Sequence, residues 1–275
     1  MECRESSPNR LHWSFEEIPY GSIERDQVGA DQKLFYLLTS ASFVEITSDV
    51  YASKLVDYFH EDPAVRNWLA ENWQREELQH GIALKRYVNT VWPEFDWDRA
   101  YTQFYDEYAP RCAVKPLGPT PALELASRCV VETGTATLYE MLQRMSVEPV
   151  LRALTGCIKL DEVQHYKYFY HYFLSYQQRE QLRVTAVLRT LWNRIFEIEN
   201  EDAYYAFKHV FLESHPKQRF YDDQFEVFCR HYRMLARRYY PYEMGIKMLL
   251  KPIGLSRTLR RATVPFFLAG ARYLS

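Results

Sequence analysis

Two stretches of this chain decide its fold: Arg75-Glu76-Glu77-Leu78-Gln79-His80 and Leu160-Asp161-Glu162-Val163-Gln164-His165. Each ends in Glu-x-x-His, with a second acid directly before the glutamate. Residues three apart on an α-helix share one face and lie about 4.5 Å apart along its axis. One helix can therefore offer a carboxylate and an imidazole to the same metal ion, and the repeat predicts two such helices.

A lone glutamate precedes each pair by a similar distance, since Glu45 stands 32 positions before Glu77 and Glu132 stands 30 positions before Glu162. One glutamate from each of two further helices completes a set of four carboxylates and two imidazoles, which binds two iron or manganese ions inside helical bundles. Four ionised carboxylates buried without metal would cost more than a domain's net stability, whereas two divalent cations balance them. The expected metal ligands are Glu45, Glu77, His80, Glu132, Glu162 and His165.

The number of Glu-x-x-His pairs can be compared with the number expected by chance. With 8 histidines and 24 glutamates in 275 residues, composition alone gives about 0.7 Glu-x-x-His pairs. Two pairs with matching upstream glutamates exceed that number. The alternative is that the acids are solvated helix charges and the histidines are ordinary core residues. Asp57-x-x-His60 has a similar spacing but no second half, and we interpret it as surface.

Composition indicates one ordered, helical domain. The chain has 16% aromatic residues and only 9 glycines, which favours a packed helical interior. The 5 cysteines are scattered and form no Cys-x-x-Cys pair, so they predict neither a disulfide framework nor a rubredoxin-type site, and they fit a reducing cytoplasm. The first residues lack the apolar core of a signal peptide, and no stretch approaches the length of a membrane span. We expect a cytoplasmic protein that does not bind nucleic acid.

Charge is near balance overall, at −2, but no acid follows Glu243. This end favours an acidic partner or peripheral contact with an anionic membrane, and the alternative is a basic helix folded against an acidic body. The basic residues after Glu243 are Lys247, Lys251, Arg257, Arg260, Arg261 and Arg272.

Apolar spacing predicts the helices. The first begins at Asp31 and ends before Asp62-Pro63, with Glu45 on its apolar face, and the second runs from Pro63 to about Val91. A shorter helix covers about residues 97 to 108 and precedes a loop that contains Pro110. The third and fourth ligand-bearing helices cover about 121 to 145 and 149 to 176. At least two more follow, with breaks near Asn200 and His215-Pro216. The expected divisions are an arm over 1–30, one domain over 31–250 and a tail over 251–275.

Small residues crowd the third of these helices around Thr133-Gly134-Thr135-Ala136-Thr137. Glycine costs roughly 1 kcal/mol relative to alanine inside a helix, so another requirement favours it here. We infer that the helix leaves space beside the metal for dioxygen and substrate. The alternative is close packing against a neighbouring helix.

These residues resemble the motifs of soluble acyl-carrier-protein desaturases and, more widely, of ferritin-like non-haem di-iron oxidases. The desaturase motifs read Glu-Glu-Asn-Arg-His-Gly and Asp-Glu-Lys-Arg-His-Glu; this chain has Glu-Glu-Leu-Gln-His-Gly at 76–81 and Asp-Glu-Val-Gln-His-Tyr at 161–166. The match covers about residues 31 to 176. It implies an all-α, ferritin-like four-helix bundle with additional peripheral and C-terminal helices. It also implies a catalytic role for Thr135 in proton delivery, while Glu76 and Asp161 would orient the opposite motif's histidine.

Related families differ at particular positions. Arylamine N-oxygenases add a histidine where this chain has Ile158, and ribonucleotide reductase small subunits place a radical tyrosine where it has Leu84. Rubrerythrins carry a Cys-x-x-Cys module, and iron-storage ferritins lack the second motif histidine.

The resemblance implies an oxygen-dependent oxidoreductase. Its cofactor would be two iron ions, with manganese as the alternative, and dioxygen would be a co-substrate. We expect oxidation of an unactivated C–H bond, with desaturation of an acyl chain held on an acyl-carrier protein or as another thioester placed first. Hydroxylation or N-oxygenation of a small molecule is the alternative, and a non-catalytic metal-binding helical protein belongs to a different class. Electrons would come from a ferredoxin-type partner, and a homodimer is compatible with this pattern.

Overall fold

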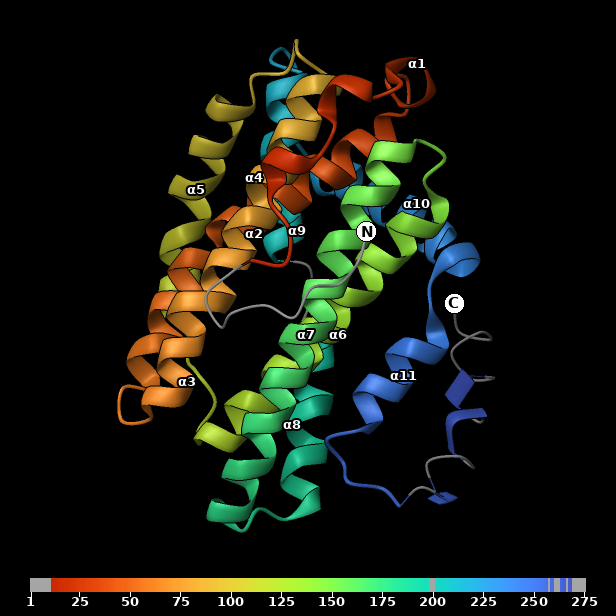
Figure 1. Cartoon of the computed structure of the whole chain (residues 1–275). Helices are drawn as coiled ribbons and strands as arrows, with labels where there is room; N and C mark the ends of the chain where they lie inside the picture. The colour runs from red at the N-terminus through yellow and green to blue at the C-terminus, as the bar shows by residue number, and fades with distance from the viewer. Residues whose placement is uncertain (1–10, 198–200, 257, 260–262, 266, 269–275) are drawn as a thin grey trace. The chain divides into compact units, whose positions relative to one another are not determined.

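The protein is all-helical. A computed structural model describes residues 11–197, 201–256, 258–259, 263–265 and 267–268, and no strand occurs within these ranges (Figure 1). The α-helices are α1 (Arg25–Val28), α2 (Gln32–Tyr58), α3 (Pro63–Trp68), α4 (Gln74–Val91), α5 (Trp97–Val114), α6 (Pro121–Met145), α7 (Pro149–Glu180), α8 (Val184–Glu197), α9 (Glu201–Ser214), α10 (Asp222–Tyr239) and α11 (Tyr242–Leu250). Short 3₁₀ turns cover Phe15–Glu17 and Tyr20–Ser22, and a π-helical turn, η3, covers Leu69–Trp73.

Capping residues fix where the main helices begin. The side chain of Asp31 accepts hydrogen bonds from the backbone N–H groups of Lys33 and Leu34 at the start of α2. Asp62 caps α3 in the same way, and Thr120 caps α6; in both helices proline occupies the first turn. Proline suits that position because the first N–H groups of a helix have no intrahelical partner. The starts expected near 31, 63 and 121 are therefore confirmed.

Two helices differ from the expectation. The helical run from Pro63 to Val91 is present, but the π turn η3 divides it into α3 and α4. Helix α5 continues beyond Pro110 to Val114, whereas the sequence suggested an end near residue 108. Proline removes one backbone hydrogen bond, but Ala109 and Cys112 on either side of it are buried. Packing therefore holds the last turn of α5. The break expected near Asn200 lies outside the described residues.

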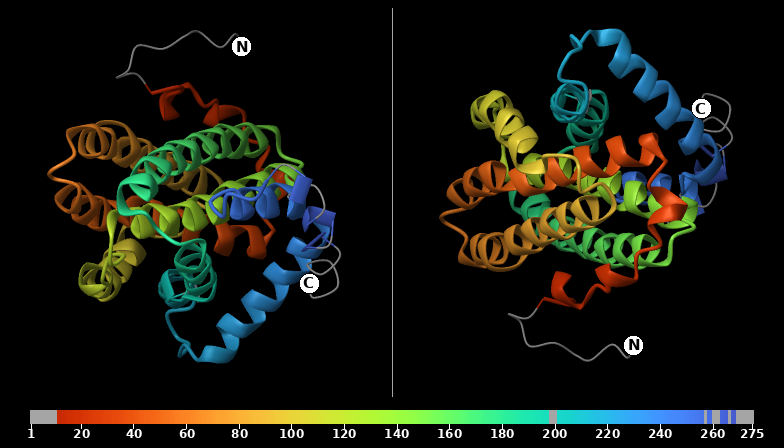
Figure 2. Two further views of the ribbon diagram at one scale, coloured as in Figure 1. Left: turned by 90° about the horizontal axis from the view of Figure 1, so that it is seen from below. Right: turned by 90° about the horizontal axis from the view of Figure 1, so that it is seen from above.

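The chain divides into two compact units. The first comprises the described residues within Met1–Lys115, Glu148–Leu154 and Asn200–Phe225. In it α2 packs along α4 and also contacts α5 and α9, and the views in Figure 2 show α2 and α4 side by side. The 3₁₀ turns of the N-terminal segment also contact α4. The core is aromatic: Phe43 packs edge-on against Trp97 and stacks on Phe104.

The second unit comprises the described residues within Pro116–Val147, Thr155–Glu199 and Glu226–Ser275. Helix α6 is central here, because it contacts both α8 and α11. Side-chain hydrogen bonds and ion pairs join it to α7, including Lys159 Nζ to Gln143 Oε1 at 2.7 Å and to Glu140 Oε2 at 3.0 Å. The expected division into an arm, one domain and a tail stays a prediction.

Among the described residues, no helix combines the length and the apolarity needed to cross a membrane. Of the six basic residues after Glu243, Lys247 and Lys251 are described, whereas the four arginines lie outside the described residues.

Candidate metal centre

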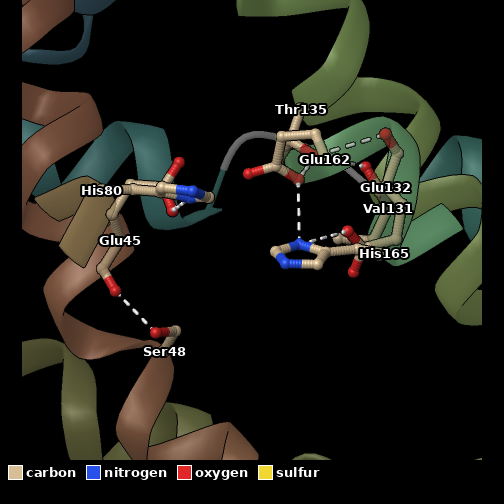
Figure 3. Close-up of polar contacts among 8 residues, drawn as sticks. All are labelled: Glu45, Ser48, His80, Val131, Glu132, Thr135, Glu162 and His165. Atoms are coloured by element: carbon tan, nitrogen blue, oxygen red, sulfur yellow. Dashed lines mark hydrogen bonds and ion pairs between the residues drawn. The ribbon is translucent and has the colours of Figure 1, made fainter. Parts of the chain in front are cut away.

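The first unit brings Glu45, Glu77 and His80 together. Glu45 comes from α2, and Glu77 and His80 lie one turn apart on α4. One ligand atom from each lies within 4.8 Å of the others. His80 Nδ1 is 3.8 Å from Glu45 Oε2, and Figure 3 shows these two side chains. All three are buried, His80 completely. We call these residues the first triad.

Gly81 permits the close approach of α4 to α2 at the first triad. A Cβ atom built on Gly81 would lie 2.3 Å from Ile46 Cγ1, 2.7 Å from the Ile46 backbone nitrogen and 3.2 Å from Glu45 Cβ. Any larger residue would push α4 away from α2 at the level of the triad. Glycine directly after the motif histidine therefore has a physical reason in the packing of two helices.

The N-terminal segment also reaches the first triad. The ring of Trp13 stacks on the imidazole of His80, with centroids 6.2 Å apart and planes 5° apart. Trp13 is buried, and the Tyr20 hydroxyl donates to the backbone carbonyl of Ala83 on α4 at 3.2 Å. The sequence alone does not predict a role for Trp13, which lies in the segment 1–30 expected to form an arm. The only available signal was a cluster of large residues at Trp13, Phe15 and Tyr20 in an otherwise polar stretch.

The second unit brings Glu132, Glu162 and His165 together in the same manner. Glu132 comes from α6, and Glu162 and His165 lie one turn apart on α7. One ligand atom from each lies within 4.8 Å of the others. His165 Nδ1 is 3.5 Å from Glu132 Oε2 and 3.8 Å from Glu162 Oε2 (Figure 3). All three are at most 2% exposed. We call these residues the second triad.

Thr135 belongs to the second triad's surroundings. Its hydroxyl lies 2.6 Å from Glu162 Oε2, to which it donates, and at longer distances of 3.4 and 3.3 Å from the backbone carbonyls of Val131 and Glu132. The shortest contact is therefore with a carboxylate of the triad rather than with its own helix. Thr135, which was expected to act together with the metal ligands, therefore forms a hydrogen bond with one of them, Glu162.

Gly134 tests the two explanations for the small residues of α6. A Cβ built on Gly134 would meet nothing within 4 Å among the described residues, and the residue is exposed. No described residue therefore packs closely against this glycine. Because Gly134 is exposed and two residues from the buried Glu132, it lies on the other side of α6 and does not show space beside the metal ligands either. The hydroxyls of Thr133 and Thr137 donate back to the carbonyls of Cys129 and Thr133, as threonines inside helices commonly do.

Burial disfavours the ionised form of the carboxylates in the second triad. It raises the pKa of Glu132 to about 7; the nearby Glu162 also raises this pKa, and His165 opposes both. A bound cation would reverse the effect, because it favours the ionised carboxylate.

The donor atoms of each triad fit a metal ion. The histidine-to-glutamate separations of 3.5–3.8 Å exceed those of direct hydrogen bonds, about 2.7–3.2 Å. Two ligand atoms that are each about 2.0–2.2 Å from one ion lie about 3–4 Å apart. Imidazole and carboxylate together suit iron and manganese, while the absence of thiolate from both triads argues against a structural zinc site.

The other acids and histidines of the motifs have distinct environments. Glu76 and Asp161, directly before the motif glutamates, are buried. His60 of the Asp57-x-x-His60 spacing is exposed, and its Nδ1 lies 2.8 Å from the Asp57 carbonyl oxygen. The interpretation of this pair as surface is confirmed.

A scan of protein-family models, a search of curated proteins and a search of solved structures each found no match to this chain. The resemblance to di-iron oxidases therefore depends on the motifs.

Proposed function

We propose that this protein is an oxygen-dependent, non-haem di-iron oxidase. In this proposal α2, α4, α6 and α7 form a ferritin-like four-helix bundle, and the two triads together bind one pair of iron ions, with manganese as the alternative. The ligands are Glu45, Glu77, His80, Glu132, Glu162 and His165.

The observation that carries the proposal is the duplication of a buried Glu–Glu–His triad, each assembled from one helix with a lone glutamate and one with Glu-x-x-His. Buried carboxylates are rare unless they are paired or bind metal. Four carboxylates and two neutral imidazoles neutralise two divalent cations. When bound, two ferrous ions would supply the electrons and open coordination positions that dioxygen chemistry requires.

The chain's own groups have separate tasks around such a centre. The Thr135 hydroxyl holds Glu162 Oε2 through a 2.6 Å hydrogen bond and is positioned to pass a proton to or from that oxygen. The Trp13 ring lies parallel to the imidazole of His80, and both side chains are buried.

The substrate and partners follow from the resemblance of the motifs. We propose desaturation of an acyl chain held on an acyl-carrier protein or as another thioester, with a ferredoxin-type electron donor. Hydroxylation or N-oxygenation requires the same ligands, because the pocket rather than the metal set selects the bond that reacts. Product analysis with acyl-carrier thioesters, free acids and amines distinguishes these outcomes.

Metal loading tests the centre itself. The purified chain should bind about two irons and develop near-ultraviolet charge-transfer absorption after reduction and exposure to air. Glu132→Ala should abolish this absorption, whereas Glu140→Ala on the same helix, where Glu140 pairs with Arg144 and Lys159, should not. An unchanged iron content in Glu132→Ala would reject the ligand assignment.

Magnetic measurements distinguish one dinuclear centre from two separate ions. A shared centre predicts spin coupling between the irons, and Glu132→Ala should remove that coupling. Two independent sites predict uncoupled irons and the loss of only one ion in this variant. Iron that binds without reacting with dioxygen would instead indicate a non-catalytic metal-binding protein.

A further inference from the structure

A groove in the second unit runs along α11 and consists of two adjoining cavities of about 870 and 770 Å³. Both volumes lie in the range typical of small-molecule sites, about 300–1,000 Å³. The cavities share Val163 of α7 and Met248 of α11, and Met244 extends the same apolar wall. We call this feature the α11 groove.

Specific contacts fix the walls of the α11 groove. The Tyr166 hydroxyl donates to the Met248 backbone carbonyl at 2.6 Å, which ties α11 to α7. The Thr137 hydroxyl bonds the Tyr240 hydroxyl at 3.0 Å. A Cβ on Gly245 would lie 3.2 Å from the Tyr240 hydroxyl oxygen, so the glycine allows this close approach. The groove is thus held on both sides by hydrogen bonds to neighbouring helices.

Positive charge exceeds negative charge along the groove. Its basic side chains are Arg144, Lys159, Lys167, Lys247 and Lys251, and its acidic side chains are Glu140 and Glu243. Both acids already form ion pairs with basic residues of the groove, Glu140 with Arg144 and Lys159, and Glu243 with Lys247. The surplus positive charge therefore lies on the two remaining lysines, Lys167 and Lys251.

Lys251 is the cation best placed to hold a ligand. It is half-buried, and no carboxylate of the described residues pairs with it. Its Nζ instead lies over the faces of two tyrosine rings, 4.5 Å from the centroid of Tyr170 and 5.8 Å from that of Tyr166. Such contacts orient an ammonium group without neutralising its charge. Lys251 thus offers a fixed cation beside an apolar wall.

We propose that the α11 groove binds a single-chain amphiphile with one anionic head group, whose head pairs with Lys251 and whose chain lies against Val163, Met244 and Met248. The apolar wall would exclude water from the ion pair, which strengthens it. Val163 and Tyr166 directly follow Glu162 and His165 in the sequence, so the ligand would lie against the helix that carries two of the proposed metal ligands. The proposal does not depend on metal binding.

Calorimetric titration of the full chain tests this site with dodecanoate, dodecyl phosphate, dodecanol and inorganic phosphate as probes. We expect saturable binding of one or both anionic amphiphiles, much weaker binding of dodecanol and no competition by inorganic phosphate alone. Lys251→Met should weaken the binding at least about tenfold, since it removes the charge but keeps an apolar stem. Val163→Trp should block the wall that both cavities share.

Arg238→Met is the matched control, because Arg238 also lies over a tyrosine ring, 5.1 Å from Tyr239, but does not line the groove. It should bind the probes as the unaltered chain does. The proposal is overturned if dodecanol binds as tightly as the anions, if Lys251→Met binds unchanged, or if no probe binds saturably. Circular dichroism verifies the fold of each variant, and iron content measured in parallel separates a failure here from a failure of the proposed oxidase centre.

Discussion

Replacement of Gly81 by alanine should damage the first triad through helix packing alone. The new Cβ would lie 2.3 Å from Ile46 Cγ1, a side-chain atom that can rotate away, but also 2.7 Å from the Ile46 backbone nitrogen. Ordinary contact begins near 3.4 Å, so the backbones of α2 and α4 must separate by about 0.7 Å. Metal sites tolerate errors of only about 0.2 Å in ligand distances. A displacement of Glu45 from Glu77 and His80 by about 0.7 Å therefore exceeds the error that a metal site tolerates.

The energetic cost follows from two opposing effects. Overpacking costs about 1–3 kcal/mol, and alanine regains roughly 1 kcal/mol over glycine through helix propensity. We expect the metal-free variant to lose up to about 2 kcal/mol of unfolding free energy. Metal affinity should fall about 10- to 100-fold, the loss common when support around a metal site is disturbed. Urea unfolding and equilibrium dialysis against ferrous iron under anaerobic conditions measure these quantities.

Gly134→Ala supplies the control for this experiment. The same change in α6 meets open space, so it should stabilise the chain by up to about 1 kcal/mol through helix propensity and leave metal affinity unchanged. A Gly81→Ala protein with the stability and metal affinity of the unaltered chain would refute the packing argument and the role assigned to the glycine after His80.

Three further predictions concern the second unit. Thr135→Val removes the hydroxyl that donates to Glu162 Oε2 and should slow oxygen-dependent turnover while iron content holds, with Thr135→Ser restoring the rate; equal rates in all three proteins would exclude proton delivery. Arg128→Met leaves the buried Glu124 without its 3.2 Å ion pair and should cost about 3–5 kcal/mol in urea unfolding, so a loss below 1 kcal/mol would contradict this prediction. Burial raises the pKa of Glu132 to about 7, above its ordinary value, so unfolding free energy of the metal-free chain should fall as pH rises. The loss begins near the ordinary carboxyl pKa and is complete above pH about 7, with a total of about 3 kcal/mol. Bound ferrous iron should remove this slope, and a flat metal-free profile would argue that the carboxyl is not desolvated.

Local sequence rules predicted several helix starts. Asp31, Asp62-Pro63 and Thr120-Pro121 mark three starts, because capping and the fixed φ of proline act within one turn. The prediction failed at Pro110, where burial of its neighbours keeps α5 helical. It also missed the π turn before α4, because a single wide turn requires no particular residue type and depends on how the helix packs against its neighbours.

The sequence by itself determined which residues share a helix face, including Glu77 with His80 and Glu162 with His165, because the 3.6-residue repeat of backbone hydrogen bonds is a local property. Only the tertiary structure decided that Glu45 approaches His80, that Trp13 from the N-terminal segment stacks on the same imidazole and that Lys251 lies over two tyrosines of α7. These contacts join residues far apart in the chain, and their geometry depends on how closely whole helices pack, which no local pattern encodes.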